Sequence, residues 1–313
     1  MATADTMDHL VNETRSLLVG SLPDDLSVLG QPYSPGDATI NLRYPKKNLA
    51  PGSFVSVGLN TFYVLANGSE GSEIQVIPEM DGGPDVAVPE STIVRCKPRF
   101  TNWSIFNNLQ AEIHSMSSPL SGLYGVKHFE KPVDWANGTY PMPADFGDVV
   151  RLLVARYQIA GTDQWYPLSG CEYQREQNLV RLVGAAALNA LNVQFVFAIP
   201  FTEPDTLEQT IESLGIPQEM ADIPTLGCAS QMALGNEGRR MQSFSQGDAR
   251  RPQEVPMGAN TSVSRSFAEM KKNRVNEELA RLTATYGWVQ NSGVQQPTAG
   301  GYYNYGGNWQ GLT

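Results

Sequence analysis

Between residues 39 and 96, short apolar runs alternate with turn-forming residues, and this pattern constrains the fold more than any other feature of the chain. The runs are ATINLRY, SFVSVG, TFYVLAN, SEIQVIPE and STIVRC, and Gly, Asn and Pro separate them. Val, Ile, Tyr and Phe at alternating positions, interrupted by such residues, indicate short strands joined by tight turns. About five strands in so short a stretch predict a small SH3-like β-domain over 37–100.

Strand patterns return between Val126 and Phe201. The runs are DVVRLLVARYQIAG, QWYPLSGCEYQRE, NLVRLVG and NVQFVFAIPF, and the alternation in the last run indicates a strand with one buried face. We therefore expect a β-sandwich-like domain over 126–203, with Trp165, Tyr166 and Tyr173 supplying large apolar area to its core. Exposed aromatics on such a sheet could instead form a platform for a sugar, and one sequence does not separate the two.

Helical patterns lie before, between and after these β-rich parts, so the expected class is α+β. Residues 1–25 predict an amphipathic N-terminal helix that ends near Gly20. Residues 101–125 predict a bridging helix with Thr101 or Asn102 as its cap. Its apolar residues recur at helical intervals: Trp103, Phe106, Leu109, Ile113 and Met116.

The region 204–286 is expected to be helical throughout, apart from a proline-containing basic loop. An acidic connector closed by Gly215 and Pro217 leads to a helix that begins at Asp222, whose carboxylate suits the first turn. After the loop, one apolar stripe is predicted on a second helix. Its members are Val263, Phe267, Met270, Val275, Leu279, Leu282 and Tyr286. The opposite face of that helix is expected to be exposed and positive through Arg265, Lys271, Lys272 and Arg274, and Glu277 is placed to pair with Arg281.

Residues 287–313 form a Gly, Gln, Asn and Tyr-rich tract that cannot bury enough apolar surface to fold alone. We expect this tract to be extended and to dock against a partner through aromatic anchors. These anchors would be Tyr302, Tyr303, Tyr305 and Trp309.

Charge is unevenly distributed along the chain. Residues 239–281 contain nine Lys or Arg and five Asp or Glu, whereas the whole chain has a net charge of −10, so the remainder carries −14. An acidic body argues against tight DNA binding, because affinity for phosphate comes mainly from Lys and Arg. The basic patch is expected to meet an acidic protein surface.

The search for catalytic, metal and cofactor motifs is negative. The sequence has no GxSxG, HExxH, GxxxxGK[ST] or GxGxxG motif, and its three histidines are far apart. Cys96, Cys171 and Cys228 lack metal-ligand spacing and are expected to be reduced thiols in a protein made in the cytoplasm. No secretory signal or membrane span is expected. A non-enzymatic protein without metal or cofactor is the interpretation, although a hydrolase with carboxylates from distant segments remains open.

The order of motifs between residues 220 and 286 resembles a known family. A helix opening at D-x-P-x-L-G, an R-R pair, Q-G-D-x-R-R-x-x-E-V-P-x-G and a charged helix ending R-L-x-x-x-Y are similar to the C-terminal signature of head-to-tail adaptor (connector) proteins of tailed double-stranded-DNA phages. The residues that carry the resemblance are Asp222, Pro224, Leu226, Gly227, Arg239, Arg240, Gln246, Gly247, Asp248, Arg250, Arg251, Glu254, Val255, Pro256, Gly258, Arg281, Leu282 and Tyr286.

The resemblance implies a structural protein of the virion neck, located between capsid and tail. It implies a ring of about 12 copies that binds the portal protein and the next neck or tail protein, a stopper or tail terminator, and conducts DNA without specific binding. Another neck role, as stopper or tail-completion protein, is the alternative, and a carbohydrate-binding or hydrolytic virion module is a further one. The expected partner interface comprises Arg239, Arg240, Arg250, Arg251, Arg265, Lys271, Lys272, Arg274, Arg281, Trp288, Tyr302, Tyr303, Tyr305 and Trp309.

Overall fold

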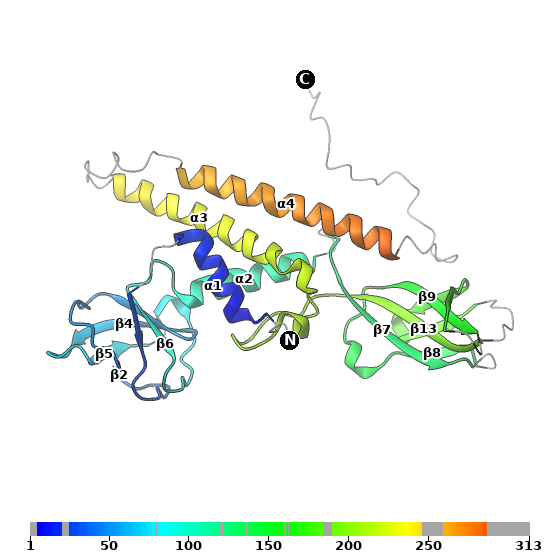
Figure 1. Ribbon diagram of the computed structural model, residues 1–313, viewed down its shortest axis with the longest axis horizontal. Helices are drawn as coiled ribbons and strands as arrows, with labels where there is room; N and C mark the ends of the chain where they lie inside the picture. The colour runs from blue at the N-terminus through cyan, green and yellow to red at the C-terminus, as the bar shows by residue number, and fades with distance from the viewer. Residues whose placement is uncertain are drawn as a thin grey trace, which may run out of the picture. The chain divides into compact units, whose positions relative to one another are not determined.

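The computed structural model describes residues 5–20, 25–78, 80–118, 122–134, 137–159, 161, 163–183, 190–245 and 259–286 (Figure 1). This part of the chain is a mixed α+β structure with antiparallel sheets and four α-helices. It divides into two compact units. Unit 1 comprises 1–125 and 200–281, and unit 2 comprises 126–199 and 282–313.

Unit 1 contains a six-stranded antiparallel sheet with the strand order β1-β6-β3-β4-β5-β2. The strands are β1 (Asp25–Val28), β2 (Thr39–Asn41), β3 (Phe54–Val57), β4 (Asn60–Asn67), β5 (Glu73–Ile77) and β6 (Ile93–Cys96). The five runs identified in the sequence correspond to β2 to β6, whereas β1 was not predicted, because its four residues are too few to show a clear alternation. Gly58, with a φ of 56°, lies in the two-residue turn between β3 and β4 and supplies the left-handed backbone that such hairpin turns need.

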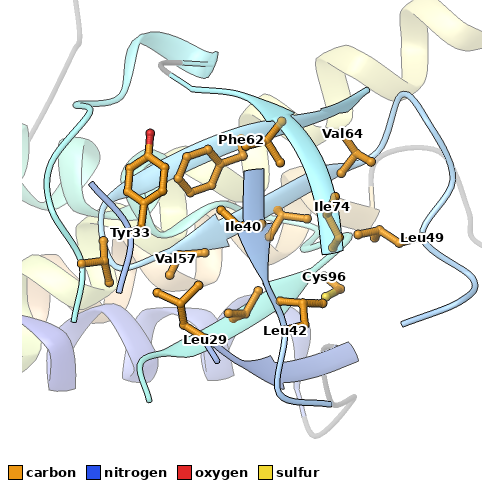
Figure 2. Packing of buried hydrophobic residues seen from close by; sticks show 14 residues of the cluster. Leu29, Tyr33, Ile40, Leu42, Leu49, Val57, Phe62, Val64, Ile74 and Cys96 are labelled. Carbon is orange, nitrogen blue, oxygen red and sulfur yellow. The ribbon is translucent and has the colours of Figure 1, made fainter. Parts of the chain in front are cut away.

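Hydrogen bonds also join the two ends of this strand order. The amide of Gly30 donates to the carbonyl of Asn41 at 2.7 Å, and the amide of Arg43 donates to the carbonyl of Val28 at 2.8 Å. Fourteen buried residues fill the interior of the sheet (Figure 2). Among them, the rings of Tyr33 and Phe62 meet edge to face, with their centroids 4.9 Å apart. The alternating apolar positions read from the sequence therefore form one core.

Helices α1 (Met7–Val19) and α2 (Asn102–Met116) both have a threonine N-cap, and that of α2 is one of the two caps that the sequence predicted. The Thr6 hydroxyl accepts from the amide of His9 at 3.4 Å, and the Thr101 hydroxyl accepts from the amide of Ser104 at 3.1 Å. The first helix ends at Gly20, at a φ of 68°. A buried Arg15 side chain joins α1 to the start of α2, because its guanidinium donates to the carbonyl of Phe100 at 2.6 Å and to the side chain of Asn102.

The connector 204–221 is not the helix that the sequence predicted. Within it lie only the short 3-10 helices η4 (Ile211–Leu214) and η5 (Gln218–Met220), and Gly215 ends the first of them at a φ of 77°. The residues before η4 form a turn and a single β-bridge, and backbone bonds hold them, such as that from the amide of Met7 to the carbonyl of Gln209 at 2.9 Å. Tertiary pairing with the start of α1 thus overrides local helix preference.

Unit 1 also contains two long helices, α3 (Asp222–Ser245) and α4 (Ala259–Tyr286), and the last residues of α4, 282–286, belong to unit 2. They run antiparallel beside each other, since Ser230 meets Ser264 and Asp222 meets Arg274 (Figure 1). Short 3-10 helices elsewhere are η1 (Met80–Gly82), η2 (Ala144–Phe146) and η3 (Arg175–Gln177).

Unit 2 contains two antiparallel sheets with the strand orders β10-β9-β13-β7 and β11-β12-β8. The strands are β7 (Gly125–Pro132), β8 (Thr139–Pro141), β9 (Arg151–Ile159), β10 (Trp165–Pro167), β11 (Cys171–Gln174), β12 (Leu179–Leu182) and β13 (Ala190–Ile199). One core draws on both sheets, including Phe129, Phe195 and Phe197 from the first and Tyr140 and Val180 from the second.

The aromatics that the sequence assigned to this core have a different place. Tyr173 packs against the core from its edge, whereas Trp165 and Tyr166 are half-buried and lie outside it. Tyr166 instead contacts Tyr157 on the neighbouring strand, with ring centroids 5.7 Å apart. The prediction that Trp165 and Tyr166 fill the core is therefore wrong, because phenylalanines of β7 and β13 occupy that space.

Candidate interaction surface

The helix pair α3 and α4 contains most of the predicted interface residues within the described part of the chain. Helix α3 begins at Asp222, and Pro224 follows in the first turn, where a missing amide hydrogen costs little. Ile223, Leu226 and Cys228 are buried, because this end of α3 packs against both α1 and α2. The base of the pair is thus anchored by ordinary apolar packing.

Helix α4, in contrast, contacts α2 and α3 through polar side chains. Ser264, Lys271, Arg274 and Glu278 follow one another at intervals of seven, three and four residues, which places them on one face of the helix, and they define a polar seam. The Ser264 hydroxyl donates to the carbonyl of Ser230 at 2.8 Å. Further along the seam, the ammonium of Lys271 binds the carboxylate of Glu112 on α2.

Glu112 is a buried carboxylate at the meeting point of three helices, with 3% of its surface exposed. It accepts from the side-chain amide of Gln231 on α3 at 2.5 Å and from the ammonium of Lys271 on α4. Gly227 lies directly beside it, and a Cβ atom at that position would stand 2.9 Å from Oε1 and closer to the other carboxylate atoms. The glycine therefore makes room for the charged group that joins the helices.

Arg274 forms a second junction on the seam. Its guanidinium binds Asp222 at 2.6 Å and Glu277 at 2.5 Å, and donates to the carbonyl of Glu219 at 2.8 Å. Its pKa is raised, first by the hydrogen bonds to Asp222 and Glu277. Asp222, at the first turn of α3, thus fixes the position of α4.

The structure separates the cations that the sequence placed together on one exposed face. Lys271 faces α2 and Arg274 faces the start of α3, and the carboxylates of Glu112 and Asp222 neutralise them there. Arg265 and Lys272 are exposed, and neither forms an ion pair with any described residue. Arg281 donates to Glu278 at 2.6 Å with its side chain 43% exposed. Among the described residues, the free cationic surface of α4 is therefore smaller than predicted.

The apolar stripe predicted for α4 is also only partly correct. Val263 and Met270 are 45% and 50% exposed, whereas Leu282 is buried. The remaining members are half-buried: Phe267, Val275, Leu279 and Tyr286. The prediction failed because ion pairs with other helices determine which face of α4 is buried. A pattern of apolar residues alone does not reveal those ion pairs.

The other predicted interface residues lie outside what the structure describes. Arg239 and Arg240 belong to the backbone of α3, but their side chains are not described. Outside the described residues altogether lie Arg250, Arg251, Trp288, Tyr302, Tyr303, Tyr305 and Trp309.

Sequence reasoning missed a pocket of about 360 Å³ between the β-domain and the helices of unit 1. Apolar surface comes from Phe54, Phe100 and Met232, and polar groups include Asp81 and Arg99. No sequence signal identifies it, because its lining comes from four separate segments. The described residues hold no group of three or more His, Cys, Asp or Glu that could bind a metal ion.

No described helix is long and apolar enough to cross a membrane. No family model matches the sequence, and no curated protein matches it.

Proposed function

We propose that this chain is a head-to-tail adaptor, a virion protein whose copies form a ring between the portal and the tail of a tailed phage. The observation that supports this proposal is the place of the D-x-P-x-L-G motif in unit 1. Asp222 holds Arg274 of α4, Pro224 and Leu226 are buried, and Gly227 makes room for Glu112. Every defining residue of the motif therefore helps to attach the α3–α4 pair.

Attachment at one end suits a docking role for the other end. Residues 246–258 join the last turn of α3 to the first turn of α4, and they contain Arg250 and Arg251. Arg265, one and a half turns into α4, is exposed. We assign the portal contact to these three arginines, because a partner surface with acidic groups would pair with them.

Two features of the fold support the two proposed β-domains. Hydrogen bonds between the ends of the six-stranded sheet support a small SH3-like barrel, since closure leaves few free strand edges. A single core shared by two sheets supports a sandwich-like second domain. In the proposed ring these domains contact neighbouring copies and the next neck protein.

Ring closure requires two different patches on each copy, and the segregated charge of the chain provides a contrast between surfaces. The net −10 charge of the chain would keep DNA from adhering as it passes through the channel. Adhesion of duplex DNA to assembled rings at physiological salt would contradict this part of the proposal.

A charge-reversal experiment tests the portal contact. Replacing Arg250, Arg251 and Arg265 together by Glu should leave a folded protein that no longer joins heads to tails. The matched control replaces three exposed cations elsewhere, Lys47, Lys131 and Arg175, by Glu, so that the net charge changes equally. Normal virion yield from the first variant, or equal loss from both, would refute the assignment.

Copy number tests the ring itself. Quantitative mass spectrometry of purified virions should give a ratio of this chain to portal near one. Absence from virions, or hundreds of copies, would instead indicate an assembly factor, an enzyme, or a capsid or tail-tube protein.

A further inference from the structure

An apolar row crosses the outer face of the β-domain. Phe54 of β3 lies opposite Tyr63 of β4, and Tyr63 lies opposite Ile77 of β5. Because these pairs are in register, the three side chains share one face of the sheet. Phe54, Ile77 and Leu65, two residues beyond Tyr63, are 41%, 42% and 47% exposed.

The row continues into the pocket of unit 1. Phe54 belongs to both, because its ring contacts Tyr63 at a centroid distance of 5.8 Å and also lines the pocket. Inside, Phe100 and Met232 offer further apolar surface, and Asn108 and Gln231 offer polar groups. The row and the pocket together form a continuous surface that suits alternating aromatic and amide side chains.

One segment of the chain has this chemistry. Residues 302–309 read YYNYGGNW, and no Asp, Glu, Lys, Arg or His occurs between 288 and 313. Tyr and Trp rings gain most from apolar surface that also offers hydrogen-bond partners at its rim. A neutral segment also avoids the cost of removing charges from water at the apolar row.

The segment is long enough to reach this surface from its own helix. Ser264 contacts Ser230, which is adjacent to Gln231 in the pocket lining, so that level of α4 lies near the pocket. From Ser264 to the end of α4 at Tyr286 the helix advances about 33 Å. Residues 287–301, which precede the docking segment, span up to about 50 Å when fully extended. The tract is therefore long enough to lead from the end of α4 back to the pocket.

We infer that residues 302–309 fold back and dock on the apolar row and pocket of their own chain. Tethering favours the same chain over a second copy, because the tether sets a local concentration in the millimolar range. The inference rests on the surface of unit 1 and on the composition and length of the tract, so it stands independently of the adaptor proposal.

Site-specific photocrosslinking of the full chain tests the inference. Benzoylphenylalanine in place of Tyr305 should crosslink to peptides that contain Phe54, Tyr63 or Met232, and the product should migrate as a monomer on a denaturing gel. Replacing Phe54 by Asp should reduce these crosslinks by roughly tenfold or more, as expected for loss of an aromatic anchor. The matched control replaces Ile93 by Asp, because Ile93 is 53% exposed on the same sheet but outside the row.

Other outcomes would overturn the inference. Dimer-sized products would assign the surface to the tract of a second copy. Crosslinks that map elsewhere, or equal losses in both Asp variants, would remove the row as the docking site. A second measurement separates loss of docking from misfolding. Replacing Tyr302, Tyr303 and Trp309 by Ser should raise the alkylation rate of a cysteine introduced in place of Leu65. The three native thiols should remain protected, which shows that the protein is still folded.

Discussion

Replacing Gly227 by Ala should destabilise unit 1, although alanine is the better helix former. The added Cβ would overlap the carboxylate of Glu112, which cannot move without losing Lys271 and Gln231. Displacing the carboxylate breaks this buried ion pair, which costs about 3–5 kcal/mol. The higher helix propensity of alanine offsets about 1 kcal/mol of this cost. We expect a net loss of about 2–4 kcal/mol in the free energy of unfolding.

Gly235 on the same helix is the matched control. Nothing lies within 4 Å of a Cβ built there, so Gly235→Ala should stabilise the protein by about 0.5–1 kcal/mol. Urea denaturation followed by pulsed alkylation of Cys228 provides the assay, because this buried thiol lies next to Gly227 and reports on this part of unit 1. The two variants should shift the midpoint in opposite directions.

A double-mutant cycle decides whether Glu112 is the cause. In a Glu112→Ala background the overlap is gone, and Gly227→Ala should become neutral or slightly stabilising. If Gly227→Ala is as harmful in that background as in the native chain, or if it matches Gly235→Ala in the native chain, the reasoning from the carboxylate is refuted.

Three further predictions follow from the seam and the thiols. Lys271→Met leaves the buried Glu112 carboxylate without its cation and should lower the free energy of unfolding by about 3–5 kcal/mol, measured by urea denaturation. Lys272→Met on the exposed face should change it by less than about 0.5 kcal/mol. Equal effects of the two variants would contradict the role of the polar seam. Burial raises the pKa of Cys96 to about 11 and that of Cys171 to about 12, so both thiols should resist iodoacetamide at pH 8 until urea is added. Because these thiols ionise near pH 8.5 when unfolded, their contribution to stability is complete below that pH and falls by about 1.4 kcal/mol per pH unit per thiol as the pH rises toward 11. A Cys96→Ala, Cys171→Ala variant should flatten that decline, and an unchanged slope of the urea midpoint against pH would count against it.

Sequence patterns predicted the elements that are stabilised by residues close together in the sequence. Thr101 caps α2 as its sequence suggests, and Phe106, Leu109, Ile113 and Met116 are buried along that helix. The same pattern missed Glu112, because a carboxylate among apolar positions looks like a solvated residue. Its partner Lys271 is 159 positions away, and no periodicity connects the two.

The candidate interface was predictable in part for the same reason. The charge of α4 and its helical nature follow from the sequence, but the direction in which each cation points depends on Asp222 and Glu112 in other helices. Exposed Arg265 and inward Arg274 are equivalent by composition and differ only in tertiary context. The pocket beside Phe54 depends on distant segments in the same way.

The polar seam has a mechanical consequence. An apolar helix face can slide along its support with little loss, whereas paired polar groups match in one setting only. A shift of α4 by one turn, about 5.4 Å, would part Ser264, Lys271 and Arg274 from their partners simultaneously. The seam therefore fixes the position of α4 along its own axis. A single-residue insertion between Ser264 and Lys271 would turn the rest of the helix by about 100° and release it, while an insertion in residues 246–258 would leave the setting unchanged.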